Sequence, residues 1–127
     1  MVAIEERFKN FLTKIGQITL MVKEFAGENV PDFVYMSLKA NLTLDKKKYT
    51  MMISPDETDF VEGHDPFTKF YIEANEDVWQ DIFDGKHTFF GGYTQNLVRI
   101  PNYRPNRFSV FFISGMLSML QHLKMKI

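Results

Sequence analysis

Few side chains in this sequence have the types and spacing that catalysis requires. The three histidines, His64, His87 and His122, have no carboxylate or second histidine at a recognised metal-ligand spacing. Asp77 and Asp81 lie four residues apart on a predicted helix, where such pairs are typical of a solvated surface rather than of acid–base catalysis. The chain also lacks cysteine, a glycine-rich phosphate loop and a serine nucleophile motif. We therefore expect a protein that is not an enzyme and that uses no metal or cofactor.

Three arginines form the most distinctive charged group. Arg99, Arg104 and Arg107 are close in sequence, and residues 85–127 carry six basic residues and no acidic one. Residues 54–84 carry ten acidic residues and one basic one. The two segments can pair with each other in the fold; alternatively, the guanidinium groups can bind a lipid head group or an anionic membrane surface. The net charge of −1 argues against nucleic-acid binding.

The composition predicts one globular domain that covers residues 1–127. Hydrophobic residues make up 45% of the sequence and charged residues 24%, a balance typical of soluble folded proteins. No apolar run approaches the roughly 18 to 20 residues of a membrane span, and the first ten residues lack the apolar stretch of a signal peptide. Together with the absence of cysteine, these features predict a cytoplasmic location.

The first 26 residues predict an amphipathic helix. Its apolar residues recur at spacings of three and four, which places on one buried face Ile4, Phe8, Phe11, Leu12, Ile15, Ile18, Val22 and Phe25. Leu20 projects on the opposite side with Met21 on the flank, so the last turns can contact a partner or another element of the chain. Gly27 and Pro31 are expected to end the helix.

Apolar and polar residues then alternate with the period of a β-strand. Residues 33–44 form the clearest predicted strand, and residues 49–53 return after a polar turn as the second strand of a hairpin. A weak third strand is predicted at residues 58–62. A strand at residues 67–74 and a short one at residues 97–100 complete the set.

A short helix is predicted between the last two strands. Asn75 can cap its free amides, and Glu76 and Asp77 are favourable at the positive end of the helix dipole. Gly85 suits the left-handed residue that follows the last turn. Residues 89–92, Phe-Phe-Gly-Gly, are predicted to form a loop.

A last helix is predicted from residue 106 or 107 to about residue 124, with apolar residues on two sides. The broader arc, which can pack on the sheet, contains Phe108, Phe112, Gly115, Met116, Met119, Leu120 and Leu123. The second arc, roughly opposite, contains Val110, Ile113 and Leu117, and Phe111 lies on one flank between the two arcs.

The second arc has three explanations. Burying each of its side chains contributes about 1.5 to 3 kcal/mol relative to exposure, so we expect these residues to be covered. The helix can be the central layer of a thick core, pack against a second copy of the chain, or form one wall of an apolar cavity for a lipid-like molecule. A close backbone approach at Gly115 and the adaptable side chains of Met116 and Met119 suit the cavity.

The order of these elements, together with the run FYIEANEDVWQDIFDGKHTFFGGYTQNLVRI, resembles the sterol carrier protein 2 (SCP2-like) family of small lipid-carrying domains. The family's strand, its polar helix start with a hydrophobic helix, and the closing Gly-Lys are similar to residues 70–74, 75–83 and 85–86. Its bulky aromatic residue with a glycine is similar to residues 90–92. The short strand before its apolar last helix is similar to residues 97–100.

This resemblance implies an α+β fold with a five-stranded, mainly antiparallel sheet and helices packed on one face around an apolar cavity. It implies the binding or carriage of a fatty acyl chain, a sterol-like molecule or an isoprenoid in a tunnel between sheet and helices. The residues expected to line that tunnel are Met36, Leu38, Ile53, Trp79, Phe83, Phe89, Phe90, Val110, Phe111, Ile113, Met116, Leu117 and Leu120. Arg99, Arg104 and Arg107 are expected to contact a head group or a membrane surface.

The alternative is a dimerisation or protein-interaction domain, because relatives of this fold also serve as dimerising appendages of larger enzymes. The partner is then a second copy of the chain or a lipid-related enzyme of which this protein is an accessory subunit. On this hypothesis Leu117 faces outward, and its replacement by glutamate dissociates a dimer.

Overall fold

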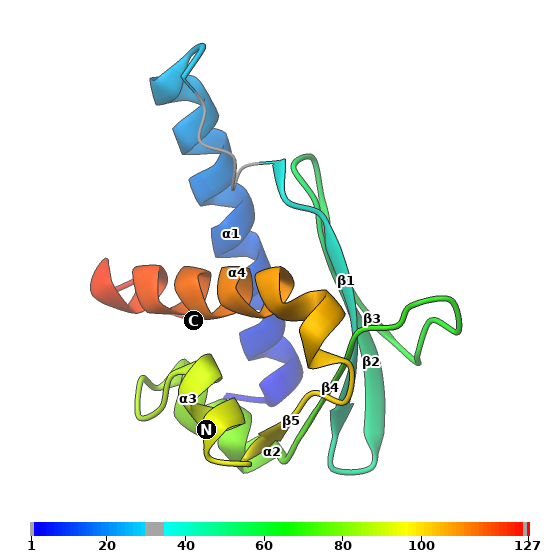
Figure 1. Cartoon of the computed structure of the whole chain (residues 1–127). Helices are drawn as coiled ribbons and strands as arrows, with labels where there is room; N and C mark the ends of the chain where they lie inside the picture. Colours follow the sequence, from blue (N-terminus) through cyan, green and yellow to red (C-terminus); the bar gives the residue numbers. More distant parts are fainter. Residues whose placement is uncertain (1, 30–34, 126) are drawn as a thin grey trace.

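Four helices and five strands follow one another in the described residues, 2–29, 35–125 and 127, of this computed structural model (Figure 1). In chain order they are α1 (Ile4–Ala26), β1 (Leu38–Leu44), β2 (Lys47–Ile53), β3 (Thr58–Glu62), β4 (Tyr71–Ala74), α2 (Glu76–Phe83), α3 (Phe89–Thr94), β5 (Val98–Arg99) and α4 (Tyr103–His122). Pro31, Phe33 and Val34, which belong to the predicted end of the first helix and the predicted first strand, lie outside the described residues.

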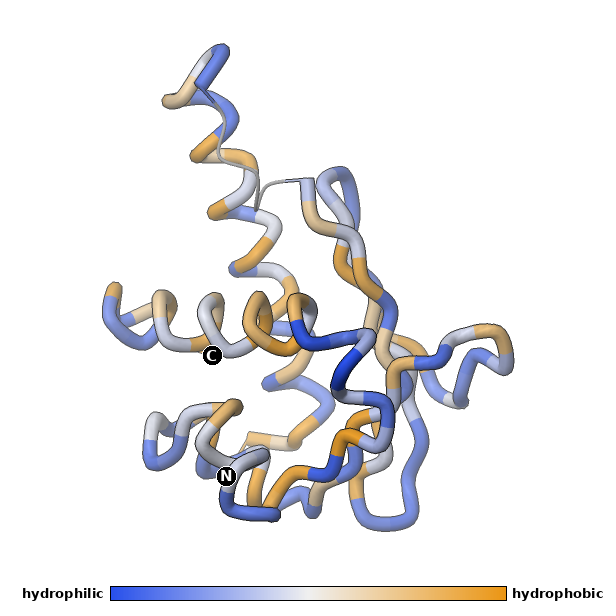
Figure 2. The backbone as a smooth tube through the Cα atoms, viewed as in Figure 1, coloured by the Kyte–Doolittle hydropathy of each residue, from blue (hydrophilic) through white to orange (hydrophobic). Residues whose placement is uncertain are grey.

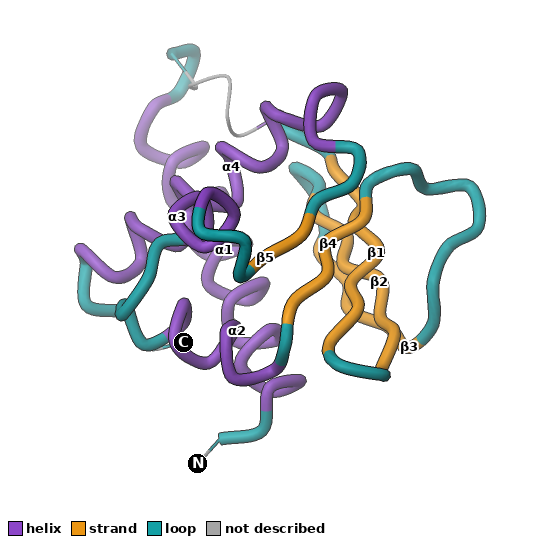
Figure 3. The backbone as a smooth tube through the Cα atoms, turned by 60° about the horizontal axis from the view of Figure 1, so that its bottom comes forward, coloured by secondary structure: helices purple, strands orange, loops and turns teal. Residues whose placement is uncertain are grey.

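The strands form one mixed sheet in the order β3-β2-β1-β4-β5. β1 and β4 run parallel, and the other neighbouring pairs are antiparallel. The four helices lie on one side of the sheet (Figures 1 and 3). The predicted α+β class, with a five-stranded and mainly antiparallel sheet, is therefore confirmed.

The alternation predicted for β1 separates the two faces of the sheet. Leu38, Ala40, Leu42 and Leu44 are buried, whereas Lys39 between them is exposed. This is the period of two expected of a strand with one face on the core. The helices cover the apolar face.

The opposite face of the sheet is partly covered by the segment between β3 and β4. Asn41, which is fully buried, donates through Nδ2 to the carbonyl oxygens of Asp65 and Thr68 at 2.9 and 3.3 Å. Its Oδ1 accepts from the Asp65 amide at 2.9 Å and from Thr50 Oγ1 at 3.2 Å. One buried amide side chain thus anchors this segment over the sheet, since buried polar groups need partners of this kind.

α1 buries the predicted stripe over most of its length. Ile4, Phe8, Phe11, Leu12, Ile15 and Ile18 are buried. Phe25 is 86% exposed, so its prediction as a buried residue is wrong. The last turns of α1 extend beyond the other helices (Figure 1), and Lys23 in them donates to the Pro55 carbonyl oxygen, in the segment after β2, at 3.0 Å. Leu20 and Met21, predicted to contact a partner or another element, are exposed within the described chain.

Residues 89–92, predicted as a loop, instead begin the helix α3. Thr88 caps it, because its Oγ1 accepts from the Gly91 amide at 2.9 Å. A Cβ atom at position 91 would lie 2.7 Å from that Oγ1, so glycine leaves room for the cap. Phe89, the first residue of α3, is fully buried. The cap and this buried ring stabilise a helix in a sequence whose two glycines indicate a loop.

The cap of α2 also differs from the prediction. Asn75 occupies the N-cap position, but its side chain makes no capping hydrogen bond. Asp45, in the turn after β1, accepts from the Glu76 amide at 3.3 Å instead. Gly85 has a φ of 80°, as predicted for the residue after this helix.

Three strands are shorter than predicted, and α4 begins earlier. β1 begins at Leu38, because the described residues 35–37 before it are not strand. β4 covers Tyr71–Ala74 and β5 only Val98–Arg99. α4 begins at Tyr103 and so includes Pro105 in its first turn, where the missing amide hydrogen costs nothing because those amides have no acceptor within the helix.

The side of α4 that faces the core is the opposite of the predicted one: the second arc is buried, and much of the broader arc is exposed. Val110, Ile113 and Leu117, the predicted second arc, are buried together with Met116 and Leu120 from the border of the broader arc. These five residues are spaced by three and four, so they form a complete stripe facing the core. Phe108 and Leu123 of the broader arc are 68% and 55% exposed.

Two consequences follow for single residues. Leu117 is 2% exposed and faces the core, so the prediction that it faces outward is wrong. Gly115 is exposed, and a Cβ atom there would meet nothing within 4 Å. The predicted close backbone approach at Gly115 is therefore wrong as well.

Among the helices of the described chain, none combines the length and the apolar character that crossing a bilayer requires.

Candidate functional site

An apolar layer between the sheet and the helices is the candidate site, and ten of the thirteen residues expected to line a tunnel lie in it. They are Leu38, Ile53, Trp79, Phe83, Phe89, Val110, Ile113, Met116, Leu117 and Leu120, all of them buried in one core cluster. Leu38 and Ile53 are direct cross-strand partners on β1 and β2. The α4 residues belong to its inward stripe.

One end of this layer is aromatic. The Trp79 ring stacks on Phe89 at a centroid distance of 5.3 Å and lies 5.7 Å from Phe83. From α1, Phe8 contacts both Trp79 at 4.7 Å and Phe83 at 5.1 Å, edge to face. Such pairs contribute about 0.5 to 1.5 kcal/mol beyond the area they bury.

Phe8 and Phe11 belong to the site, although neither was among the residues expected to line it. Phe11 lies 6.0 Å from Phe83, so α1 closes the aromatic end. The signal was present in the sequence, because both residues are in the predicted buried stripe of the first helix. That stripe was interpreted as core packing only.

The indole of Trp79 contributes the one polar atom of this end. Trp79 is fully buried, and its Nε1 finds no hydrogen-bond acceptor among the described residues. An unpartnered buried donor costs roughly 1 to 3 kcal/mol. Trp79 Nε1 is therefore a buried donor whose hydrogen-bonding capacity the described residues leave unused.

Three expected residues lie outside the layer. Met36 is half-buried before β1, Phe90 is half-buried on α3, and Phe111 is 47% exposed on α4. Phe90 and Phe111 contact each other at 5.4 Å, beside Tyr93 and Tyr103, whose rings stack at 4.6 Å. These four residues form an aromatic cluster at the edge of the core, in which Phe90, Tyr93 and Tyr103 pack against the buried residues.

The rim of the layer near β2 carries a strong polar contact. Tyr49 Oη donates to Glu5 Oε1 at 2.6 Å, and its ring stacks on Phe60 at 4.9 Å. Burial and this bond raise the pKa of Tyr49 to about 12. The same hydrogen bond is the main cause that lowers the pKa of Glu5. The contact joins the first turn of α1 to the sheet.

A hollow of about 570 Å³ lies where both terminal segments meet α2. Arg7 lines this hollow and forms hydrogen bonds with other residues that line it. Its Nη1 donates to Gln80 Oε1 at 2.8 Å and to Asp84 Oδ1 at 2.7 Å. Its Nε and Nη2 donate to the Ile127 carbonyl oxygen at 3.1 and 2.9 Å. Phe83 is the one expected tunnel residue that also lines this hollow.

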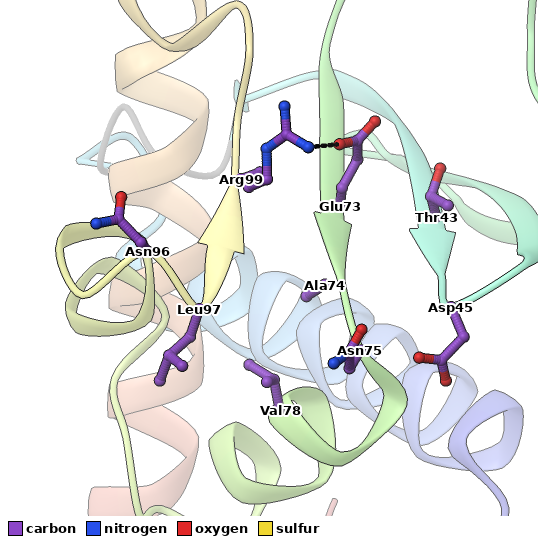
Figure 4. Close-up of a pocket in the computed structure, with 9 residues that line it drawn as sticks. All are labelled: Thr43, Asp45, Glu73, Ala74, Asn75, Val78, Asn96, Leu97 and Arg99. Carbon is purple, nitrogen blue, oxygen red and sulfur yellow. Dashed lines mark ion pairs between the residues drawn. The ribbon is translucent and has the colours of Figure 1, made fainter.

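A polar pocket of about 450 Å³ lies where β1 and β4 end beside the start of α2 (Figure 4). It is lined by Thr43, Asp45, Glu73, Ala74, Asn75, Val78, Asn96, Leu97 and Arg99. Arg99 Nη1 lies 3.5 Å from Glu73 Oε2, which pairs the basic segment with the acidic one, as one of the two interpretations of the arginines predicts. Arg104 and Arg107 form no ion pair within the described residues, and Arg107 lies over the Phe108 ring at 5.1 Å.

The other candidate chemistry stays at the surface. His64 Nε2 lies 2.9 Å from the Leu42 carbonyl oxygen, and His87 lies 3.9 Å from Asp81. Asp81 also faces Lys86 at 3.6 Å. In the ranges that the structure describes, no three histidine or acidic side chains lie close enough together to hold a metal ion.

The fold that forms this apolar layer is found in solved structures of sterol carrier protein 2. A crystal structure of sterol carrier protein 2 matches with a TM-score of 0.57 and 11% identity, over 89% of this chain and 92% of that chain. The apo form of sterol carrier protein 2 from Yarrowia lipolytica matches with a TM-score of 0.52 and 15% identity, over 91% and 87%. The chain thus has the sterol carrier protein 2 fold, as the sequence resemblance predicts.

The same fold also occurs inside a longer enzyme. The inverting sec-alkylsulfatase Pisa1 from Pseudomonas sp. matches over 65% of this chain, with a TM-score of 0.53 and 11% identity. This chain spans only 14% of that enzyme. No protein-family model matches the sequence, and no curated protein matches it in sequence.

Proposed function

We propose that the protein binds and carries a lipid-like apolar molecule, without catalysis, in the layer between its sheet and its helices. The observation that carries the proposal is the continuous apolar layer in a fold shared with sterol carrier protein 2 over 89% of the chain. The ligand classes are a fatty acyl chain, a sterol-like molecule or an isoprenoid. The cysteine-free sequence is consistent with action in the cytoplasm.

In the proposed complex the tail lies between α4 and the sheet, in an internal tunnel that opens as inward side chains rearrange. Met116 has several accessible rotamers and adapts to such a change more easily than a branched residue. Burying methylene groups contributes about 0.8 kcal/mol each, so a tail of about ten carbons gains roughly 8 kcal/mol. That gain can offset the core packing that is given up when Ile113 and Leu117 move aside.

Trp79 gives the proposed site a preference for one end of the ligand. A ligand oxygen that reaches the aromatic end accepts the hydrogen bond of Nε1, which has no acceptor among the described residues. Satisfying this donor removes the cost of its burial. A molecule with one hydroxyl, carboxyl or carbonyl oxygen on a long apolar body fits this arrangement better than a pure hydrocarbon.

Trp79 is the single tryptophan of the chain, so it also reports on binding. Energy transfer from Trp79 to a polyene fatty acid, a fluorescent sterol and a polyene isoprenoid measures uptake of each class. We expect saturable one-to-one uptake of at least one probe, and native mass spectrometry should detect the same complex. Absence of uptake for all three classes, in a protein whose circular dichroism is that of a folded chain, contradicts the proposal.

A variant within the layer tests its position. Ile113→Phe enlarges a fully buried side chain of α4 and should reduce uptake at least tenfold, since the added ring occupies the tail's place. Phe25→Ser is the control, because Phe25 is 86% exposed at the free end of α1. Equal uptake by both variants contradicts this location of the site.

The second candidate function is a dimerisation or protein-interaction domain, which includes service as an accessory subunit of a lipid-related enzyme. It is favoured by the projecting end of α1, where Leu20, Met21 and Phe25 are 59%, 53% and 86% exposed. Light scattering over a range of protein concentrations should detect a homodimer. Phe25→Glu should then dissociate it, whereas a monomer at all concentrations contradicts the homodimer.

A further inference from the structure

The outward side of α4 carries an apolar stripe: Phe108, Phe111 and Leu123 lie outside the core cluster, whereas Phe112 and Met119 are partly buried against it. Phe108 is 68% exposed, Phe111 47% and Leu123 55%, and Phe112 and Met119 are half-buried. Phe108, Phe112, Met119 and Leu123 are spaced by four, seven and four residues, so they follow one line along the helix, and Phe111 flanks that line. Figure 2 shows that apolar residues recur along α4, which lies across the outside of the molecule in Figure 1. We name these five residues the α4 outer stripe.

Basic residues lie at both ends of the α4 outer stripe, and neither α3 nor α4 contains an acidic residue. Arg104 and Arg107 in the first turns and Lys124 just past the helix are all exposed. None of the three forms an ion pair within the described residues. α3, which packs beside α4, contains no acidic residue, and the sequence from residue 85 onward contains none.

The positive charges at the start of α4 destabilise this helix unless a negatively charged group lies close to them. The first turn of α4 has no acidic residue, and its N-cap Asn102 makes no side-chain capping bond. Arg104 and Arg107 therefore add positive charge to the positive end of the helix dipole. A phosphate group at this end would satisfy both the dipole and the guanidinium groups.

We propose that α4 is a membrane-docking helix that lies flat on an anionic phospholipid surface, with the α4 outer stripe in the interface. An interfacial helix has this composition: phenylalanine and leucine toward the acyl chains, and basic residues beside them at the level of the head groups. Tyr93 and Tyr103, which stack next to Phe111, are residues that favour the same interfacial depth. At 1.5 Å per residue, the 20 residues of α4 offer a contact about 30 Å long.

A second copy of the chain is a poorer occupant of this face. A two-fold contact centred on the stripe would set the two copies of α4 antiparallel, with Arg104 and Arg107 of one copy near Lys124 of the other and no acidic residue of α3 or α4 to neutralise them. An anionic surface neutralises these charges. This docking face goes beyond the lipid-binding proposal, because it requires no ligand inside the protein.

Vesicle flotation tests the proposal with the full chain. Wild type should bind vesicles of phosphatidylcholine with 30% phosphatidylserine at least tenfold more strongly than pure phosphatidylcholine, and this preference should weaken with added salt, as electrostatic binding does. Phe108→Ser with Leu123→Ser should lower binding to the anionic vesicles at least tenfold. Arg104→Gln with Arg107→Gln should lower it similarly and abolish most of the salt dependence.

Matched controls lie on other faces of the protein. Phe67 is 89% exposed on the segment between β3 and β4, so Phe67→Ser removes an equally exposed ring away from α4. Lys46→Gln with Lys48→Gln removes two exposed charges from the β1–β2 hairpin. Both control proteins should bind the anionic vesicles as wild type does. Phe108→Trp should show a blue-shifted emission only with anionic vesicles, and Phe67→Trp should show no shift.

Several outcomes would overturn the docking face. They are equal binding to both vesicle compositions, no binding at all, or equal losses in the control proteins and the α4 variants. Light scattering without vesicles tests whether a second copy of the chain occupies this face. If wild type is a homodimer and Phe108→Ser with Leu123→Ser dissociates it, the face binds a second copy rather than a membrane. The same double variant should take up soluble lipid probes as wild type does, so failure of docking and failure of lipid uptake are distinguishable.

Discussion

Tyr49 Oη donates to Glu5 Oε1 at 2.6 Å, and this bond joins the middle of the sheet to the first turn of α1. Tyr49 is 5% exposed and its ring stacks on Phe60, so the phenol is held at the rim of the apolar layer. Lys47 Nζ lies 3.6 Å from the same Glu5 oxygen. The first turn of α1 is thus fixed by a hydrogen bond to a charged acceptor, a stronger kind than one between neutral groups.

Tyr49→Phe should lower the free energy of unfolding by about 1 to 2 kcal/mol near neutral pH, because it removes this charge-assisted bond and keeps the ring. The effect should be full above pH 4.5, the usual pKa of Glu5, and shrink as pH falls through the lowered pKa of the folded protein. It should also shrink as pH rises from 10 through about 12, where folded Tyr49 ionises. Urea unfolding of both proteins across this range measures the difference. A difference that stays constant down to pH 2 would contradict the assigned role of Glu5.

The strands that form the sheet could be predicted, because their signal is local. Alternation along β1, a polar turn and a second alternating run define a hairpin without knowledge of the rest of the chain. The predicted third strand coincides with β3, Thr58–Glu62. The order of helices and strands, together with the residue run 70–100, predicts the sterol carrier protein 2 fold, and the solved structures confirm that fold.

The errors concern contacts between distant segments. α3 depends on the Thr88 cap and on Phe89 packing against Trp79, and the two glycines within it conceal both. For α4, the helical spacing gives the angle between residues but does not say which side faces the sheet. Met116 and Leu120 lie at the border between the two predicted arcs. Together with the narrower arc of Val110, Ile113 and Leu117 they form the stripe that faces the core. At the aromatic end of the layer, Trp79 and Phe83 belong to the predicted tunnel lining, whereas Phe8 belongs to the stripe predicted to pack in the core, and the structure places the three rings in contact.

Asn41→Ala should lower the free energy of unfolding by about 2 to 3 kcal/mol. The side chain is fully buried, and its removal leaves the Asp65 amide and the Thr68 carbonyl oxygen without their partner. Lys39→Ala is the control, because its ion pair with Asp65 at 2.9 Å is solvent-exposed and should contribute less than about 1 kcal/mol. Chemical denaturation compares them. Equal losses would show that the segment between β3 and β4 does not depend on the buried amide.

Arg7→Met should release the C-terminal residues from α2. The guanidinium binds Gln80, Asp84 and the Ile127 carbonyl oxygen, and its side chain is only 12% exposed. Methionine keeps the apolar stem and removes every one of these bonds, so we expect a loss of about 2 to 3 kcal/mol. Carboxypeptidase digestion should also become faster. Asp84→Asn, at a side chain 45% exposed, should have a smaller effect on both measurements.

The two sides of α4 should respond oppositely to alanine. Ile113→Ala removes a fully buried side chain from the inward stripe and should lower the free energy of unfolding by about 2 to 4 kcal/mol. Gly115→Ala, two residues further on, should raise it by about 0.5 to 1 kcal/mol, because the new methyl group meets nothing within 4 Å and alanine is the better helix former. Thermal unfolding of the two variants checks both signs. A destabilising Gly115→Ala would mean that this side of α4 packs against protein, and it would remove the free surface on which the membrane-docking face depends.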